Sequence, residues 1–272
     1  MPDWTKSMQR TYEYYLVDPL SWCDKSRITC VKSSTIERDS SEATTGHATL
    51  EVTESLNECY IRIYMVVIQN GVTEKFPLAT VLAQTPGNDF DGKIASMSIE
   101  AYMPLVELKE TLPPYGFTIM KNANIMENAC KNIQEHMRAP LIVTESNKTL
   151  VENFVSNTDD TWLTFNSDLI AKADFSFSTD EMGTVTFSPK RELEAMQPVV
   201  TFGDDEHSIL QPSISTEYDL YGVPNVVEVI YSGDNQFFKS RIENNDPTSI
   251  TSTVNRGREI LYRDTNPNIT GT

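Results

Sequence analysis

An Asn-Gly dipeptide between two β-rich runs is the feature that most constrains the fold of this chain. Residues 58–69 are dense in Tyr, Ile and Val, and a second β-prone run covers residues 73–84. Asn70 and Gly71 lie between the runs, and both residue types tolerate the positive φ angles of a tight hairpin turn. The sequence therefore predicts an antiparallel hairpin in a β-rich N-terminal region.

Shorter segments extend this β character on both sides of the hairpin. Apolar residues alternate with polar ones from Ala48 to Val52, as in a half-buried strand. Residues 33–46 are polar without periodicity and are predicted to form an exposed loop. The other predicted strands are residues 26–32 and 93–106. Because Pro113 and Pro114 cannot continue a ladder, we expect residues 1–114 to form a first small β-barrel or sandwich.

The pattern becomes helical after Pro114. Residues 122–139 carry an apolar stripe at a spacing of four, made by Ile125, Ala129, Ile133 and Met137. Asn122 or Asn124 is suited to cap the start of this helix, and Pro140 ends it. A strand is expected at residues 140–144. Residues 115–192 are therefore predicted to form an α/β module inserted between β-domains.

The same module is predicted to hold a second helix and a hairpin. The helix begins near Thr158, where Asp159 and Asp160 suit the positive N-terminal end of a helix dipole. Trp162 and the apolar residues after it supply the buried side. The hairpin pairs residues 175–177 with residues 185–187 through a turn.

β character returns in the last eighty residues. Residues 226–231 are predicted to pair with residues 236–242, and residues 249–254 are a further β-prone stretch. Residues 193–272 are therefore predicted to form a second β-barrel domain, completed by strands from elsewhere or truncated. The predicted fold class is mixed α+β and mainly β, with two small β-barrels and an inserted α/β module.

No motif for catalysis, cofactor binding or metal binding is recognisable in the sequence. The four cysteines are isolated, which favours buried free thiols over disulfides or a metal site: Cys23, Cys30, Cys59 and Cys130. The histidines His47, His136 and His207 are far apart. The acidic cluster 204–207 ends in His207 and could bind a divalent metal, but a solvated loop is the favoured interpretation because no second ligand group follows. We expect no enzymatic activity.

Composition narrows the classes of partner. The net charge is −17, from 39 acidic and 22 basic residues, which argues against stable binding to nucleic acid. An acidic surface could instead repel passing DNA or simply keep the protein soluble. Neither a signal peptide nor a membrane-spanning segment is recognisable, so we expect a protein assembled in the cytoplasm without membrane insertion.

Several short segments of the sequence resemble segments of the hub proteins of phage tails and related contractile injection systems. The first resemblance lies in the middle of the chain. It consists of a run before a helix (117–121), a strand (140–143), a helix with Trp162, and a hairpin (175–187) whose Asp-x-x-Gly turn holds Asp180 and Gly183. The second lies near the C-terminal end and consists of a strand (225–231), an Asn-Asp-Pro sequence (245–247) and a basic segment with a glycine turn (252–258).

The resemblance implies a structural role at the virion tail tip. It implies a homotrimeric ring that adapts the tail tube to a central spike or fibre and lets DNA and the tape-measure protein pass. The expected partners are copies of the chain itself, a distal tail or tube protein, the spike or fibre protein and the tape-measure protein. The alternative is a receptor-binding or cell-surface-binding β-rich tail module.

Overall fold

The computed structural model describes residues 2–90, 95–191, 196–198, 217, 219–233 and 236–265. The chain forms two compact units, Met1–Lys190 and Arg191–Thr272. Strands outnumber helices in both units, so the fold is mainly β with a few helices, as predicted. The acidic cluster at residues 204–207, which ends in His207, lies outside the described residues.

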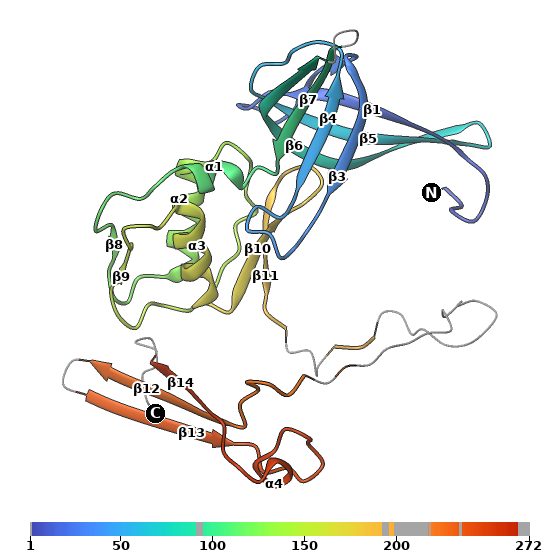
Figure 1. Cartoon of the computed structure of the whole chain (residues 1–272). Coiled ribbons are helices and arrows are strands. Elements are labelled where there is room, and N and C mark those ends of the chain that lie inside the picture. The colour runs from blue at the N-terminus through green and yellow to red at the C-terminus, as the bar shows by residue number, and fades with distance from the viewer. Residues whose placement is uncertain are drawn as a thin grey trace. The chain divides into compact units, whose positions relative to one another are not determined.

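A seven-stranded antiparallel sheet fills the first part of the N-terminal unit (Figure 1). Its spatial order is β2-β1-β5-β6-β7-β4-β3. The strands are β1 (Gln9–Val17), β2 (Asp24–Ile28), β3 (Val31–Glu37), β4 (His47–Val52), β5 (Cys59–Gln69), β6 (Val72–Phe90) and β7 (Ala95–Tyr102). The end strands β2 and β3 do not pair with each other, so the described strands form an open sheet and no closed barrel.

The predicted central hairpin is confirmed. Asn70 and Gly71 have φ angles of 51° and 77°, and Gln69 faces Val72 across the turn. The alternation in β4 is also confirmed, because Ala48, Leu50 and Val52 are all buried. These side chains belong to an apolar cluster inside the sheet, together with Ile61, Ile63, Ala79, Val81 and Ile99.

The helices lie in a module that follows the sheet in the chain. Its elements are α1 (Val106–Glu110), β8 (Thr118–Ile119), α2 (Ile125–His136), β9 (Phe154–Val155), α3 (Trp162–Ala171), β10 (Phe175–Thr179) and β11 (Val185–Pro189). The predicted stripe of α2 is buried in a second apolar cluster with Trp162 and Phe165 of α3. Asn124 caps α2 by accepting a hydrogen bond from the Glu127 amide at 3.0 Å.

A buried amide pair joins the two long helices of the module. Asn132 of α2 donates to Asn166 Oδ1 of α3 at 3.2 Å, and Asn166 donates to the Trp162 carbonyl at 2.7 Å. These bonds satisfy polar side chains that would otherwise weaken an apolar core. Asn166 therefore fits on the inner side of α3, where the apolar pattern alone does not place it.

The C-terminal unit is built on a three-stranded sheet of order β13-β12-β14. Its elements are β12 (Val226–Gly233), β13 (Gln236–Glu243), α4 (Thr253–Arg256) and β14 (Leu261–Thr265). The predicted pairing of residues 226–231 with residues 236–242 is confirmed, and in it Val227 lies opposite Ile242. The third strand, β14, pairs in parallel with β12.

Several local predictions are wrong. The second helix of the module begins at Trp162, capped by Thr161, and not near Thr158. The strand expected at residues 26–32 is divided between the ends of β2 and β3. Part of the expected loop 33–46 is the edge strand β3, and the strand expected at 93–106 gives way to helix α1 at its end. The expected strand 140–144 is reduced to a single bridge between Leu141 and Val185. In the β-prone stretch 249–254, Ser252 caps the short helix α4.

Candidate interaction surfaces

The two described histidines and the four cysteines do not gather into a reactive site. His47 lies 3.7 Å from Glu37 and 3.6 Å from Glu42, and His136 stacks on Trp162 at a centroid distance of 4.1 Å. All four cysteines are free thiols. Within the described residues, no group of three or more His, Cys, Asp or Glu side chains is arranged to hold a metal ion.

Burial makes two of the thiols poor nucleophiles. Burial is the main cause that raises the pKa of Cys59, to about 11, and it also raises the pKa of Cys130. A thiol that stays protonated at neutral pH reacts slowly, because the thiolate is the nucleophile. The chemistry of these residues is therefore that of small apolar side chains.

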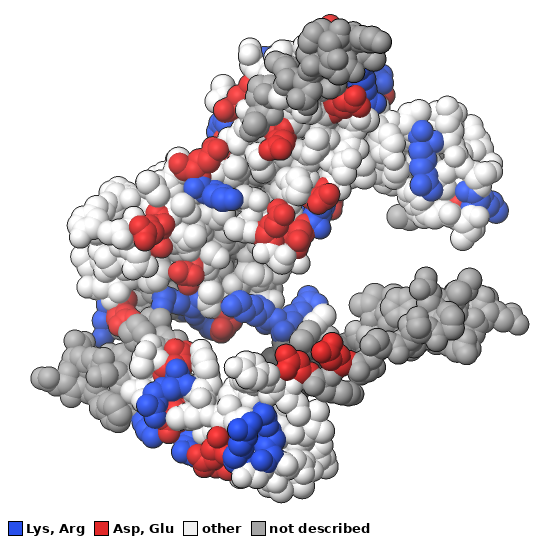
Figure 2. Space-filling view, viewed as in Figure 1, with Lys and Arg blue, Asp and Glu red and all other residues white. Residues whose placement is uncertain are grey.

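The tip of the β5–β6 hairpin, residues 65–76, projects beyond the rest of the sheet, and the N-terminal chain runs beside it (Figure 1). Ile68 and Val72 on this hairpin tip are 36% and 58% exposed, and Trp4 and Tyr12 nearby are about half exposed. Figure 2 shows a mostly uncharged surface here, with Lys and Arg as the main visible charges. Apolar groups collected on a projection are typical of a contact surface.

Specific contacts fix the N-terminal chain against the hairpin tip. The Asp3 amide donates to Gln69 Oε1 at 2.7 Å, and Gln69 Nε2 donates to the Asp3 carbonyl at 2.9 Å. Trp4 packs on Phe76 with ring centroids 5.7 Å apart. The exposed aromatic and aliphatic groups are therefore held in place before any partner binds, which lowers the entropic cost of association.

A buried arginine joins the sheet to the α/β module. Arg62 of β5 is 1% exposed; it donates to Asp24 Oδ1 at 2.8 Å and to Thr80 Oγ1 at 3.0 Å. It also donates to the Met182 carbonyl at 3.1 Å, in the turn between β10 and β11. We call this set of contacts around the turn the turn socket.

Three further donors, from β6 and from the segments directly before β2 and after β3, complete the turn socket. Trp22 Nε1 donates to the Met182 carbonyl at 2.8 Å, and Thr80 Oγ1 donates to the Glu181 carbonyl at 3.1 Å. Arg38 pairs with Glu181 at 2.7 Å. The socket thus satisfies turn carbonyls and the buried guanidinium together, so it orients the module on the sheet.

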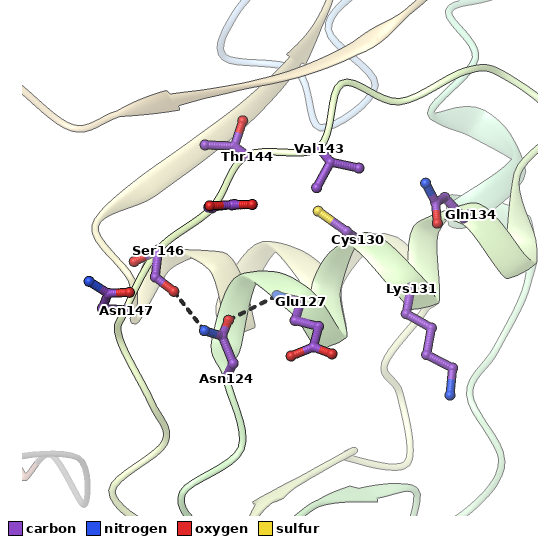
Figure 3. A pocket seen from close by; sticks show the side chains of 10 residues that line it. Asn124, Glu127, Cys130, Lys131, Gln134, Val143, Thr144, Ser146 and Asn147 are labelled. Carbon is purple, nitrogen blue, oxygen red and sulfur yellow. Dashed lines mark hydrogen bonds between the residues drawn. The ribbon is translucent and has the colours of Figure 1, made fainter.

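A groove of about 490 Å³ lies between α2 and the chain segment 143–147 (Figure 3). Cys130 and Val143 face each other across it, whereas Lys131 points away. Asn124 ties the two walls, since its Nδ2 donates to the Ser146 carbonyl at 2.6 Å. The groove is lined by neutral polar and apolar groups, the two carboxylates Glu127 and Glu145 and the Lys131 stem, without a histidine or an activated nucleophile.

None of the helices in the described part of the chain is long and apolar enough to cross a membrane.

Neither a protein-family model nor a curated protein matches the sequence. Solved structures do match over nearly the whole chain. A tail protein from Neisseria meningitidis MC58 has a TM-score of 0.62 at 12% identity, over 95% of this chain and 72% of its own.

Two prophage proteins show the same likeness. The 43 kDa tail protein of prophage MuSo2 from Shewanella oneidensis has a TM-score of 0.59 at 11% identity, over 96% of this chain and 74% of its own. The prophage tail protein gp18 from Listeria monocytogenes EGD-e has a TM-score of 0.52 at 11% identity, over 93% of this chain and 72% of its own. The chain therefore has the fold of phage-type tail proteins.

Proposed function

We propose that this chain is a structural hub subunit of a phage-type tail tip or baseplate. In this role it forms a homotrimeric ring that adapts the tail tube to a central spike or fibre. The observation that carries the proposal is the likeness to three tail proteins over 93–96% of the chain. Its partners in the tail are then the distal tail or tube protein, the spike or fibre protein and the tape-measure protein.

The projecting hairpin tip supports an assembly role. Its exposed apolar groups, Ile68 and Val72, lie beside the half-exposed Trp4 and Tyr12. Apolar surface on a rigid projection gains free energy when a neighbouring subunit covers it. We therefore assign the hairpin tip as a contact between neighbouring subunits of the tail.

Free sheet edges support the same role. Among the described strands, β2 and β3 end the seven-stranded sheet, and β13 and β14 end the three-stranded one. An edge strand offers unpaired backbone groups that a neighbouring strand can pair with. In the proposed ring, each open sheet is completed into a barrel-type wall by a neighbour, and closed symmetry satisfies every edge.

The acidic composition fits a channel that conducts DNA without binding it. With a net charge of −17, the chain lacks the cationic excess that stable phosphate binding requires. In the proposed ring an acidic inner wall repels DNA within a Debye length of about 8 Å at physiological salt. The role is structural and not enzymatic, so zymography of the pure protein on cell-wall substrate is expected to stay blank.

The assembly is tested by measuring mass with light scattering, alone and mixed with the neighbouring tail protein. We expect the mass of three chains at least in the mixture. The double variant Ile68→Glu/Val72→Glu should lose this mass because it places charges in the contact. The matched control Ile142→Glu/Val143→Glu changes two similarly exposed residues of the α/β module. A wild-type chain that stays monomeric in the mixture overturns the proposed ring.

Receptor or cell-surface binding is the second candidate, favoured by the half-exposed Trp4 and Tyr12 on the projection. Aromatic side chains of this kind are enriched in binding hot spots. The two roles differ in a competition assay, in which pure protein is added before phage. A receptor-binding module reduces adsorption to host cells, whereas a hub subunit leaves adsorption unchanged.

A further inference from the structure

Residues 140–150 of the α/β module form an extended segment that passes beside α2 (Figure 3), and we call it the outer segment. It contains no turn or bend, and none of its residues has a positive φ angle. Leu141 forms a bridge with Val185 of β11, and Thr149 forms one with Asn124 at the start of α2. Both ends of the outer segment are therefore fixed to the module. It is separate from the strand edges assigned to the proposed ring.

Alternate residues of the outer segment attach their backbone to the fold. The Pro140 carbonyl accepts a hydrogen bond from the Val185 amide at 2.9 Å, and the Ile142 amide donates to the Val185 carbonyl, also at 2.9 Å. The Thr144 amide lies against the thiol of Cys130 in α2, where it lowers the thiol pKa against the larger, raising effect of burial. These contacts all belong to even-numbered residues.

The alternation continues to the end of the outer segment. The Ser146 carbonyl accepts from Asn124 Nδ2 at 2.6 Å, and the Lys148 carbonyl accepts from the Ile125 amide at 3.1 Å. Leu150 bonds with the residues before α2, through its amide at 3.0 Å and its carbonyl at 2.8 Å. The backbone groups of the even-numbered residues thus form one edge of the segment, and that edge is held by β11 and the region of α2.

The opposite edge of the outer segment is free. In an extended chain the backbone groups of successive residues point to opposite sides, so the odd-numbered residues supply this second edge. In the described structure their N–H and C=O groups make no hydrogen bond: Leu141, Val143, Glu145, Asn147 and Thr149. A long row of unpaired backbone donors and acceptors is a template for a further strand.

The surface beside this free edge suits a strand with apolar side chains. Ile142 and Val143 are 54% and 60% exposed, and Val143 faces Cys130 across the groove of about 490 Å³ (Figure 3). The groove leaves room for a side chain of an added strand next to Val143. Because both ends of the outer segment are fixed, pairing costs little additional backbone entropy.

The charges near the free edge favour a basic residue in the added strand. Lys148 already pairs with Asp174. Glu145 and Glu127 both line the groove, and neither makes an ion pair in the described structure. Lys131 points away from the groove. A Lys or Arg placed near Glu145 therefore gains a complementary charge.

We propose that the free edge of the outer segment binds an extended segment of a partner protein by β-strand addition. The N–H groups of the added strand donate to the carbonyls of Val143, Glu145 and Asn147, and its carbonyls accept from their amides. An apolar side chain of the partner lies beside Val143 at the groove, and a basic one lies near Glu145. The partner strand extends the β10–β11 sheet beyond residues 140–142.

Other occupants fit the free edge less well. A helix satisfies its own backbone groups, so it would leave this edge unpaired. A nucleic acid would bring phosphates towards Glu127 and Glu145, which repel them. The edge lies apart from the hairpin tip, so the strand addition and the proposed ring can each fail without the other.

The first test uses the full chain and a blocked peptide, Thr-Val-Thr-Val-Lys-Val-Thr, that is N-methylated at every second residue. This peptide keeps one edge for pairing and cannot form sheets with itself. The control peptide has the same side chains but is N-methylated at every residue. NMR titration at millimolar peptide should show binding of the first peptide, with slowed exchange of the Val143 and Glu145 amides, and at least about tenfold weaker binding of the control. Equal binding of both peptides, or no binding of the first, overturns the proposal.

The second test removes one donor from the free edge. Val143→Pro deletes an N–H group that has no partner in the described structure, so the fold loses no hydrogen bond. It should weaken binding of the first peptide at least about tenfold, whereas Val143→Ala, which keeps the N–H group, should stay within about threefold. Matching melting temperatures of the two variants check the fold. Unchanged binding in Val143→Pro overturns the pairing, and self-association of the wild type that Val143→Pro abolishes would assign the edge to a second copy and overturn the foreign partner.

Discussion

The two units of this chain have different kinds of interior. The N-terminal unit contains apolar clusters in the sheet and in the α/β module, with Ile63 and Ile133 fully buried. In the C-terminal unit, Val226 is the one buried apolar side chain among those whose exposure is described. The centre of that unit is a carboxylate, Glu228, which is covered by cationic side chains of the neighbouring strands.

The contacts of Glu228 show how the C-terminal sheet is organised. Its oxygens lie 2.7 Å from Lys239, 2.8 Å from Arg263 and 3.6 Å from Arg241. These residues come from all three strands, so the carboxylate links them across one face. On the other face Ile242 is 73% exposed and Tyr262 54% exposed. Apolar burial is insensitive to pH and salt, whereas an ion network depends on both. The two units should therefore respond differently to the same changes.

The largest effect is expected for Ile133→Asp. Ile133 is fully buried in the module core, so the variant places an unpaired charge there and removes apolar contacts. We expect a loss of more than about 4 kcal/mol in the stability of the module. Hydrogen exchange should show the loss in α2 and α3 while the β5–β6 hairpin stays protected by its own cluster. Loss of protection in that hairpin would contradict the separation of the two cores.

Arg62→Met should have the next largest effect. It removes the ion-pair partner of Asp24 and one of the two donors to the Met182 carbonyl in the turn socket, at a cost of about 3 kcal/mol. Chemical denaturation should show this loss as a lower midpoint. Hydrogen exchange of the backbone amides should increase most in β10 and β11. An unchanged midpoint would mean that the module is held without Arg62, because the contacts of Trp22, Thr80 and Arg38 with the turn remain.

Glu228→Gln should destabilise only the C-terminal unit. Lys239 and Arg263 hold the pKa of Glu228 below its ordinary value of 4.5. A lowered folded-state pKa stabilises the unit above that value, and the stabilisation is lost as pH falls through the folded pKa. For the wild type, the protection factors of the backbone amides in β12–β14, which are corrected for the intrinsic exchange rate, should therefore fall in acid or at high salt. In the variant these protection factors should already be lower at pH 7 and should depend less on pH.

The smallest effect is expected for Ile242→Asp, the counterpart of Ile133→Asp. Because Ile242 is 73% exposed, the variant should change stability by no more than about 0.5 kcal/mol. Thermal melts of both variants, recorded side by side, give the comparison. A large loss at Ile242 would show that its face is covered in solution.

Local patterns predicted the elements whose burial follows the chain's own periodicity. The four-residue spacing from Ile125 to Met137 gave the helix α2 and its buried side correctly. The alternation at 48–52 gave β4. In these segments the residues alone determine which face is apolar, so no knowledge of neighbours is needed.

The wrong predictions concern segments whose structure depends on neighbours. β3 is polar because it is an edge strand whose outer side chains meet solvent, so it lacks the apolar signal of a strand. None of the described strands pairs with residues 249–254, and the Asn244 side chain donates hydrogen bonds to Ser249 and Thr251 within the segment. The interaction surfaces were not predictable for the same reason. Nothing near Arg62 in the sequence indicates its contact with Met182, 120 residues away.

The glycine of the β10–β11 turn has a consequence for how this fold diverges in sequence. A Cβ at Gly183 would lie 2.9 Å from the Thr80 Cβ and 3.1 Å from the Trp22 ring, and its φ is +77°. Any side chain at 183 therefore requires simultaneous changes on strand β6 and in the segment between β1 and β2. Proteins with this fold that share only about one residue in ten with this chain should keep glycine here or change all three positions together. A discontinuous pattern at 22, 80 and 183 is thus a more durable marker of descent than any contiguous stretch of the chain.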